Sequence, residues 1–164
     1  MNDIDKTLKE YLDQIKSYKK IDGYYEQIST LLLTHLYTEY FINLLIEKKF
    51  KIAKKILEDH NRYTFSVKLD LIYEKDYIPE WLYFNIRKFN KIRNSFSHNL
   101  HFDIMNCDLT FKEFGKNSKN ELVDLKTKLP LEPKEKVSNS LILLHIPTYT
   151  LINFAYHIKE QKYL

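Results

Sequence analysis

The sequence predicts an all-α protein, folded as one domain over residues 1–164 into an antiparallel bundle of four to five helices. Apolar residues recur every three or four positions through most of the long segments, which is the period of an amphipathic helix. A chain of 164 residues can bury one good hydrophobic core but hardly two. Because the chain contains 13 tyrosines and 10 phenylalanines, we expect this core to be rich in aromatic side chains.

The first two predicted helices differ in how their apolar residues are distributed. Residues 3–20 carry apolar side chains at spacings of three and four with charges between them, and Gly23 is placed to end this amphipathic helix. Residues 24–49 are apolar nearly all round, as expected of a central helix in a bundle. One apolar seam of that helix is interrupted at its middle by two ionisable residues, His35 and Glu39.

Two interpretations of this interrupted seam remain open. His35 and Glu39 are one helical turn apart, so they can satisfy each other, or the seam can lie at the edge of the solvent. Alternatively, both face a cation on another helix, and Arg93 is the candidate. Glu39 would then be the carboxylate that pairs with the guanidinium, and His35 would be a second imidazole in the same cleft.

Shorter helices are predicted next. Residues 51–59 form a short basic helix, and Thr64 is suited to cap a helix over residues 65–74. Pro79, at a first-turn position, starts a long helix that runs to about Ser97.

The signal weakens beyond this helix. Residues 109–114 are an apolar run of uncertain type, and residues 115–131 are polar and expected to form a loop. Residues 137–162 are apolar and long enough for a helix, which Pro147 should kink or divide because it cannot donate to the hydrogen-bond ladder.

The long helix that begins near Pro79 carries an arginine in its apolar stripe. The apolar positions are spaced by four, three and seven, and the open slot belongs to Arg93; they are Leu82, Ile86, Phe89 and Phe96. A guanidinium cannot lose its charge, so burial requires a carboxylate, a phosphate or a wet cleft. His98, five positions on, lies well round an ideal helix from Arg93. The two side chains can converge only if the helix ends near Ser97 or if a second protomer supplies one of them.

The segment Arg93-Asn94-Ser95-Phe96-Ser97-His98 resembles the RX4-6H motif of HEPN domains. The approach to it, with Phe65–Asp70, a short turn and a long helix, is similar to the branch related to mannitol-operon repressor proteins. The resemblance covers about residues 24–103. It implies a HEPN-like helical bundle, commonly a homodimer, in which many members are metal-independent endoribonucleases that act on RNA and others are non-catalytic.

The resemblance implies two alternative functions. In an endoribonuclease, His98 would act as general base or acid on the RNA 2′-hydroxyl, Arg93 would stabilise charge on the phosphate, and Asn94 would orient it. Ser97 and His101 would support the site. A toxin–antitoxin or phage-defence setting, with an antitoxin protein as partner, follows from the same resemblance.

In the second alternative the protein is a non-catalytic regulatory or binding module. Arg93 would then form a structural ion pair with Glu39, and His98 would cap its helix. Leu100 stands where catalytic HEPN toxins often carry a tyrosine, and this departure argues against a toxin-like enzyme in particular.

Several classes of site are not indicated. Cys107 is the only cysteine, and the sequence contains no Gly-rich phosphate loop and no HExxH motif. A metal held by His98, His101 and Asp103 would be poorly fixed. We therefore expect no metal and no cofactor. No apolar run approaches the roughly 18 residues of a membrane span, so we expect a cytoplasmic protein with no membrane partner. The net charge of +4 permits an anionic partner without identifying it.

Aromatic residues also predict dimerisation. The helix that begins near Pro79 carries five aromatic side chains in directions that cover more than one face, so Trp81 and Phe84 are expected to contact a second copy of the chain. A two-fold axis there would place Arg93 and His98 of one chain opposite those of its partner.

Overall fold

The computed structural model describes residues 3–18, 23–98, 107–108, 110–112, 122–124 and 139–160. These residues are mostly helical, so the prediction of an all-α protein is confirmed. The helices are α1 (Asp3–Tyr18), α2 (Gly23–Lys49), α3 (Ala53–Glu58), α4 (Phe65–Glu74), α5 (Glu80–Ser97) and α7 (Asn139–Glu160). The described part of the chain thus holds six helices, whereas the predicted bundle counted four to five. The two short helices, α3 and α4, were both expected at their positions between α2 and α5.

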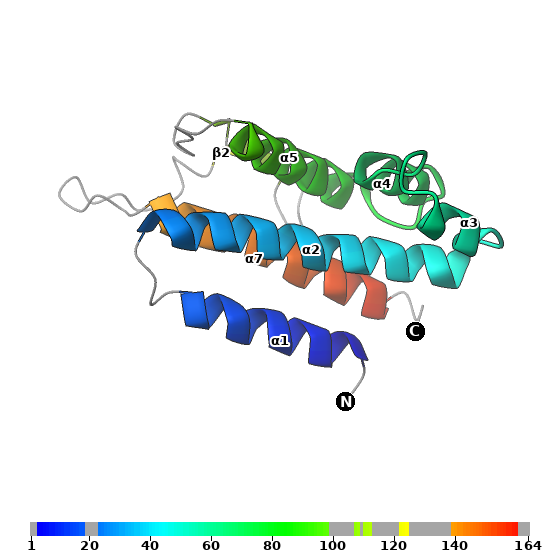
Figure 1. Cartoon of the computed structure of the whole chain (residues 1–164), viewed down its shortest axis with the longest axis horizontal. Helices are drawn as coiled ribbons and strands as arrows, with labels where there is room; N and C mark the ends of the chain where they lie inside the picture. The colour runs from blue at the N-terminus through cyan, green and yellow to red at the C-terminus, as the bar shows by residue number, and fades with distance from the viewer. Residues whose placement is uncertain are drawn as a thin grey trace.

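The four long helices alternate in direction along the chain (Figure 1). The central helix α2 lies over α7, with α1 along one side and with α4 and α5 along the other. Aromatic side chains from distant segments meet in the core, as the composition predicted. Phe41 of α2 packs edge-on against Phe154 of α7, with ring centroids 5.8 Å apart. The hydroxyl groups of Tyr11 and Thr34 are 2.9 Å apart and join α1 to α2.

The boundaries of α4 and α5 follow from local sequence. The Thr64 side chain accepts a hydrogen bond from the Val67 amide, which is the predicted cap of α4. Pro79 occupies the N-cap position of α5, and Glu80 places a negative charge in the first turn, where the helix dipole favours it. The predicted apolar stripe of α5 is buried at Leu82, Ile86 and Phe89.

Two predictions for the second half of the chain are corrected. The segment expected to be a loop contains a strand, β2 (Leu122–Asp124), which pairs antiparallel with β1 (Thr110–Lys112). Helix α7 continues past Pro147, so the prediction that Pro147 divides it is wrong, whereas the alternative that Pro147 kinks it stays a prediction. A proline removes one backbone donor, and the extensive packing of α7 against α2 offsets that loss.

Strand β1 is held against α5 by one buried side chain, Asn85. Its Oδ1 accepts from the Lys112 amide at 2.8 Å, and its Nδ2 donates to the Lys112 carbonyl at 3.0 Å. The amide of Asn85 therefore satisfies both backbone groups of Lys112 as a neighbouring strand would. Two ion pairs reinforce this attachment, Lys112 with Glu80 and Lys88 with Asp108.

Trp81 contributes to the fold of its own chain. Its side chain is half-buried and packs against the core. The predicted contact of Trp81 and Phe84 with a second copy of the chain stays a prediction. Within the part of the chain that the structure describes, no helix combines the length and the apolar character needed to cross a bilayer.

We predict that Asn85→Ala lowers the free energy of unfolding by on the order of 2 kcal/mol, because it removes two hydrogen bonds and leaves the Lys112 backbone groups unsatisfied. The Lys112 amide should also exchange its hydrogen faster. Urea unfolding and hydrogen exchange measure these effects. Asn90→Ala is the control, since within the described residues the Asn90 side chain makes a single long hydrogen bond, to Ser66 at 3.4 Å. Equal losses in the two variants would contradict the role given to Asn85.

Candidate nucleic-acid interface

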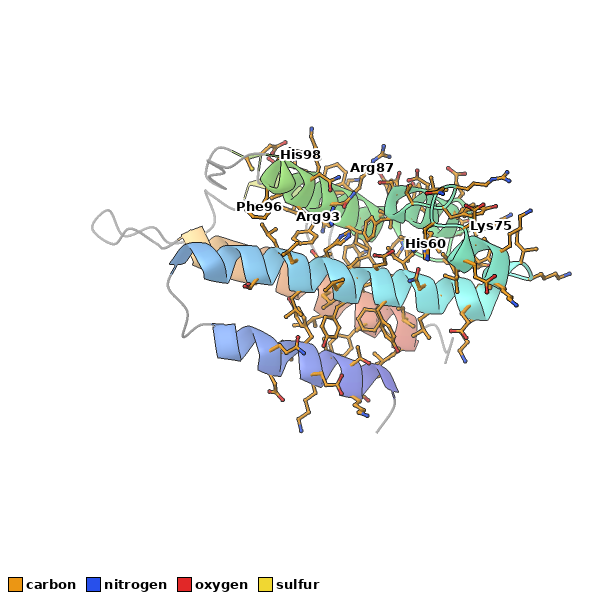
Figure 2. The ribbon with its side chains drawn as sticks, viewed as in Figure 1. His60, Lys75, Arg87, Arg93, Phe96 and His98 are labelled. Carbon is orange, nitrogen blue, oxygen red and sulfur yellow. The ribbon has the colours of Figure 1, made fainter. Side chains whose placement is uncertain are left out.

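Arg93 lies on the face of α5 that is turned toward α2 (Figure 2). The side chain is half-buried, and its Nε is a buried donor that has no hydrogen-bond partner among the described residues. Its Nη1 donates to Asn94 Oδ1 at 2.9 Å. This bond identifies Oδ1 as the accepting end of the Asn94 amide, so Nδ2 is its donor end.

Glu39 pairs with Lys68 and not with Arg93, so one of the two interpretations of the interrupted seam is wrong. Its Oε1 lies 2.7 Å from Nζ of Lys68, and no ion pair joins it to Arg93 among the described residues. Lys68, on α4, is only 2% exposed and also donates to Asn43 Oδ1 at 2.9 Å. A buried ammonium is tolerated only when acceptors surround it, and α2 provides both acceptors. Lys68 was missed because a lysine in a short amphipathic helix normally lies in solvent.

His35 lies in the same seam between α2, α4 and α5. It is 7% exposed, and its ring packs against Phe65 with centroids 4.5 Å apart. Its Nδ1 has no hydrogen-bond partner in the part of the chain that the structure describes. Burial, together with the charges of Arg93 and Lys68, lowers the His35 pKa to about 4, although the charge of Glu39 acts in the opposite direction. His35 is therefore neutral at pH 7, and burial prevents it from reaching a large substrate.

His98 occupies a different side of α5 from Arg93. Helix α5 ends at Ser97, and His98 is the exposed C-cap residue. Its side chain lines an open groove to which Asn94 and Ser95 also contribute, whereas Arg93 does not line it. Within one chain, the two ends of the motif therefore meet only through Asn94. The side chain of Ser97 and all of His101 lie outside the described residues.

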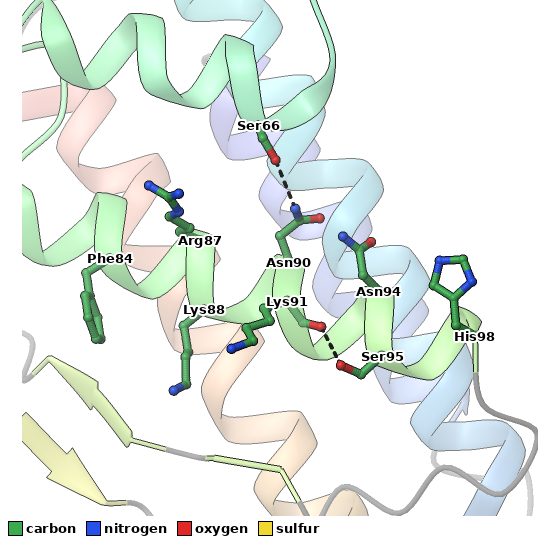
Figure 3. A pocket seen from close by; sticks show the side chains of 9 residues that line it. All are labelled: Ser66, Phe84, Arg87, Lys88, Asn90, Lys91, Asn94, Ser95 and His98. Carbon is green, nitrogen blue, oxygen red and sulfur yellow. Dashed lines mark hydrogen bonds between the residues drawn. The ribbon is translucent and has the colours of Figure 1, made fainter.

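The groove runs along the outer face of α5 and has a volume of about 560 Å³ (Figure 3). Seven of its residues come from this helix, six of them at spacings that repeat every three or four positions, while the seventh, Asn90, reaches toward α4. His98, the C-cap residue, continues the row at the end of the helix. The lining residues are Ser66, Phe84, Arg87, Lys88, Asn90, Lys91, Asn94, Ser95 and His98. This row could have been found by helical periodicity, but the motif spacing alone does not identify it.

The cations of the groove differ in their present partners. Lys88 pairs with Asp108, and Arg87 donates to the Tyr83 hydroxyl, which itself donates to Asp70. Lys91 is exposed, and no ion pair involves it within the described ranges. Lys91 and His98 are therefore the groups best placed to contact an anion directly. Among the described residues, no three His, Cys, Asp or Glu side chains gather where they could hold a metal ion.

Protonation of His35 should destabilise the fold in acid. The unfolded imidazole has a pKa of 6.5 and the folded one a pKa of about 4, so between these values the unfolded state binds more protons. The free energy of unfolding should have its full value above pH 6.5 and should fall by about 3 kcal/mol as the pH drops to 4. Urea unfolding at a series of pH values should show a smaller loss for His35→Phe.

The matched control for this experiment is His60→Gln, which changes an exposed histidine on the connector before α4. This variant should keep the pH dependence of the wild type. A His35→Phe protein with the same pH dependence as the wild type would show that His35 is not the titrating group.

Comparison with known proteins places no constraint on this site. No protein-family model, curated protein or solved structure matches the chain. The likeness to HEPN domains therefore depends on the motif residues themselves, and the function is inferred from the geometry of the groove along α5.

Proposed function

We propose that this protein is a metal-independent endoribonuclease that binds RNA in the α5 groove and cleaves it with His98. The observation that carries the proposal is an exposed imidazole at the end of a row of cationic side chains on one helix face. RNA is a polyanion whose phosphates are bound by lysine and arginine, while a neighbouring imidazole can move the proton that starts cleavage.

Binding depends on three cations of α5. Arg87, Lys88 and Lys91 lie within little more than one helical turn of one another and line the groove together. Lys91 is exposed, so it can contact a phosphate without first breaking an ion pair. The amide of Asn94 is held by Arg93 and lines the groove, so in this proposal Asn94 helps to orient the same phosphate.

In the proposed reaction, His98 takes the proton of a 2′-hydroxyl group, whose oxygen attacks the adjacent phosphorus. A 2′-oxygen to phosphorus bond forms and the bond from phosphorus to the 5′-oxygen breaks, which leaves a cyclic phosphate and a 5′-hydroxyl end. Lys91 offsets the negative charge that develops on the phosphate oxygens. The groove is open to solvent, so water can protonate the leaving 5′-oxygen.

Arg93 has an indirect role in this proposal. It faces α2 rather than the groove, so we assign it the task of holding Asn94. A homodimer, an antitoxin protein partner and a toxin–antitoxin or phage-defence setting belong to the same proposal and derive from the likeness to HEPN domains.

One observation favours the alternative, a non-catalytic regulatory or binding module. Arg93 and His98 lie on different faces of α5, so one chain does not present both to a single phosphate. In that case the groove would bind an anionic partner without cleaving it, and Arg93 would serve the fold.

We predict that the purified protein cleaves RNA in excess EDTA and that His98→Ala lowers the rate by at least about 100-fold, the range of general acid–base catalysis. The thermal midpoint should not change, because the side chain is exposed. Detection of cyclic phosphate ends identifies the chemistry. His60→Ala, which changes another exposed histidine, is the control and should cleave as the wild type does.

Two results would contradict the enzyme. The first is a wild type that cleaves no RNA in EDTA while it still binds RNA, which would establish the binding module. The second is cleavage that persists in His98→Ala, which would assign the reaction to another group or to a contaminating nuclease.

A further inference from the structure

We propose that the groove is built for single-stranded RNA and that Phe84 is a stacking site for one base, at the end of the groove opposite His98. This inference rests on the proposed function and extends it by naming the form of RNA that is bound. It depends on three observations: the environment of Phe84, the way its ring is held, and its separation from His98.

Phe84 lines the groove and does not belong to the core. Its neighbour Tyr83 stacks on Tyr73, with centroids 4.1 Å apart, and hydrogen bonds to Asp70. Trp81 likewise packs against the core. Phe84 differs from these two aromatic residues, because among the described residues it does not pack against the core. Its ring is half-buried at the surface of the groove.

The ring of Phe84 is nevertheless held by a contact with β1. Nζ of Lys112 lies 5.4 Å from the ring centroid and 2.6 Å from Glu80 Oε1. The backbone of Lys112 is fixed in turn by the fully buried Asn85. A ring held in this way loses little conformational entropy when a base stacks on it, which favours its use as a platform.

The distance along the helix fits a short strand. Phe84 and His98 lie at the two ends of the groove lining, and fourteen residues of α-helix span about 21 Å. This length corresponds to about six nucleotides at a rise of about 3.4 Å per nucleotide, and to fewer in an extended strand. The cations Arg87 and Lys91 lie between the two ends, where they can follow the phosphates.

This arrangement selects single strands because of how bases are exposed. In a duplex each internal base is stacked on both faces, so it cannot also stack on a protein side chain. In a single strand, a base can turn out and stack on an aromatic ring, and such contacts tolerate any base. The groove should therefore discriminate by strandedness much more than by sequence.

The test uses a set of eight-nucleotide 2′-deoxy strands, each with one 2-aminopurine at a different position. The fluorescence of 2-aminopurine falls when it stacks. The strands lack the 2′-hydroxyl nucleophile and stay intact on the wild-type protein. We expect one 2-aminopurine position to be quenched on binding. Phe84→Leu should remove this quenching and weaken binding about tenfold, whereas Phe84→Tyr should keep both. The same strand annealed to its complement should bind more weakly than the single strand.

The outcomes separate this inference from the proposed function. Two results would overturn the stacking site. The first is a Phe84→Leu protein that binds the strand and quenches 2-aminopurine as the wild type does, and the second is a duplex that binds as tightly as the single strand. Cleavage in EDTA would then still support the enzyme. A wild type that binds no strand and cleaves no RNA overturns both. Thermal unfolding of Phe84→Leu and Phe84→Tyr, with equal midpoints, shows that a loss of binding does not arise from loss of β1.

Discussion

The interaction on which the arrangement of the helices depends is the burial of Lys68 between α4 and α2. Its ammonium group is almost completely removed from solvent and is held by Glu39 and Asn43, one turn apart on α2. Because a buried charge without acceptors is strongly unfavourable, α4 has few positions against α2 that are acceptable. His35 lies next to this pair and remains neutral, which limits the positive charge in a seam that also contains Arg93. The packing of α4 then fixes α5 beside it.

The position of α4 against α2 gives the two faces of α5 different roles. The inner face buries its apolar stripe and directs Arg93 toward α2, so the charge of Arg93 contributes to the seam rather than to the groove. The outer face carries Lys91, Asn94 and His98 at helical spacing. Asn94 connects the two faces, since it accepts from Arg93 and also lines the groove. The residues Arg93 to His98 are contiguous in the sequence, but their side chains lie on two faces of the helix. Arg93 therefore holds Asn94, which lines the groove, and does not line the groove itself.

Local signals in the sequence were sufficient to predict where the helices lie along the chain. They were insufficient to predict which side chains of different helices contact each other. The Thr64 cap, the start of α5 and the inward direction of Arg93 follow from residues close in sequence, and the structure has all three. The partner of Glu39 could not be predicted, because a lysine at position 68 is expected to lie in solvent. Only the packing of α4 against α2 brings Lys68 to Glu39. The strand pair was missed because strands of three residues are too short to show an alternating pattern. The role of Asn85 depends on a contact with Lys112, 27 residues away, which only the folded chain reveals.

The central claim is that RNA binds to the outer face of α5 and not to the seam that contains His35. Imidazole resonances of the protein labelled with ¹⁵N-histidine can be followed by NMR while a 2′-deoxy strand is added, so that the bound strand is not cleaved. We predict that the His98 resonances shift progressively on addition of the strand, whereas those of His35 stay in place because that ring is buried behind the helix. Shifts of His35 with no change at His98 would contradict this account and would place the ligand in the seam.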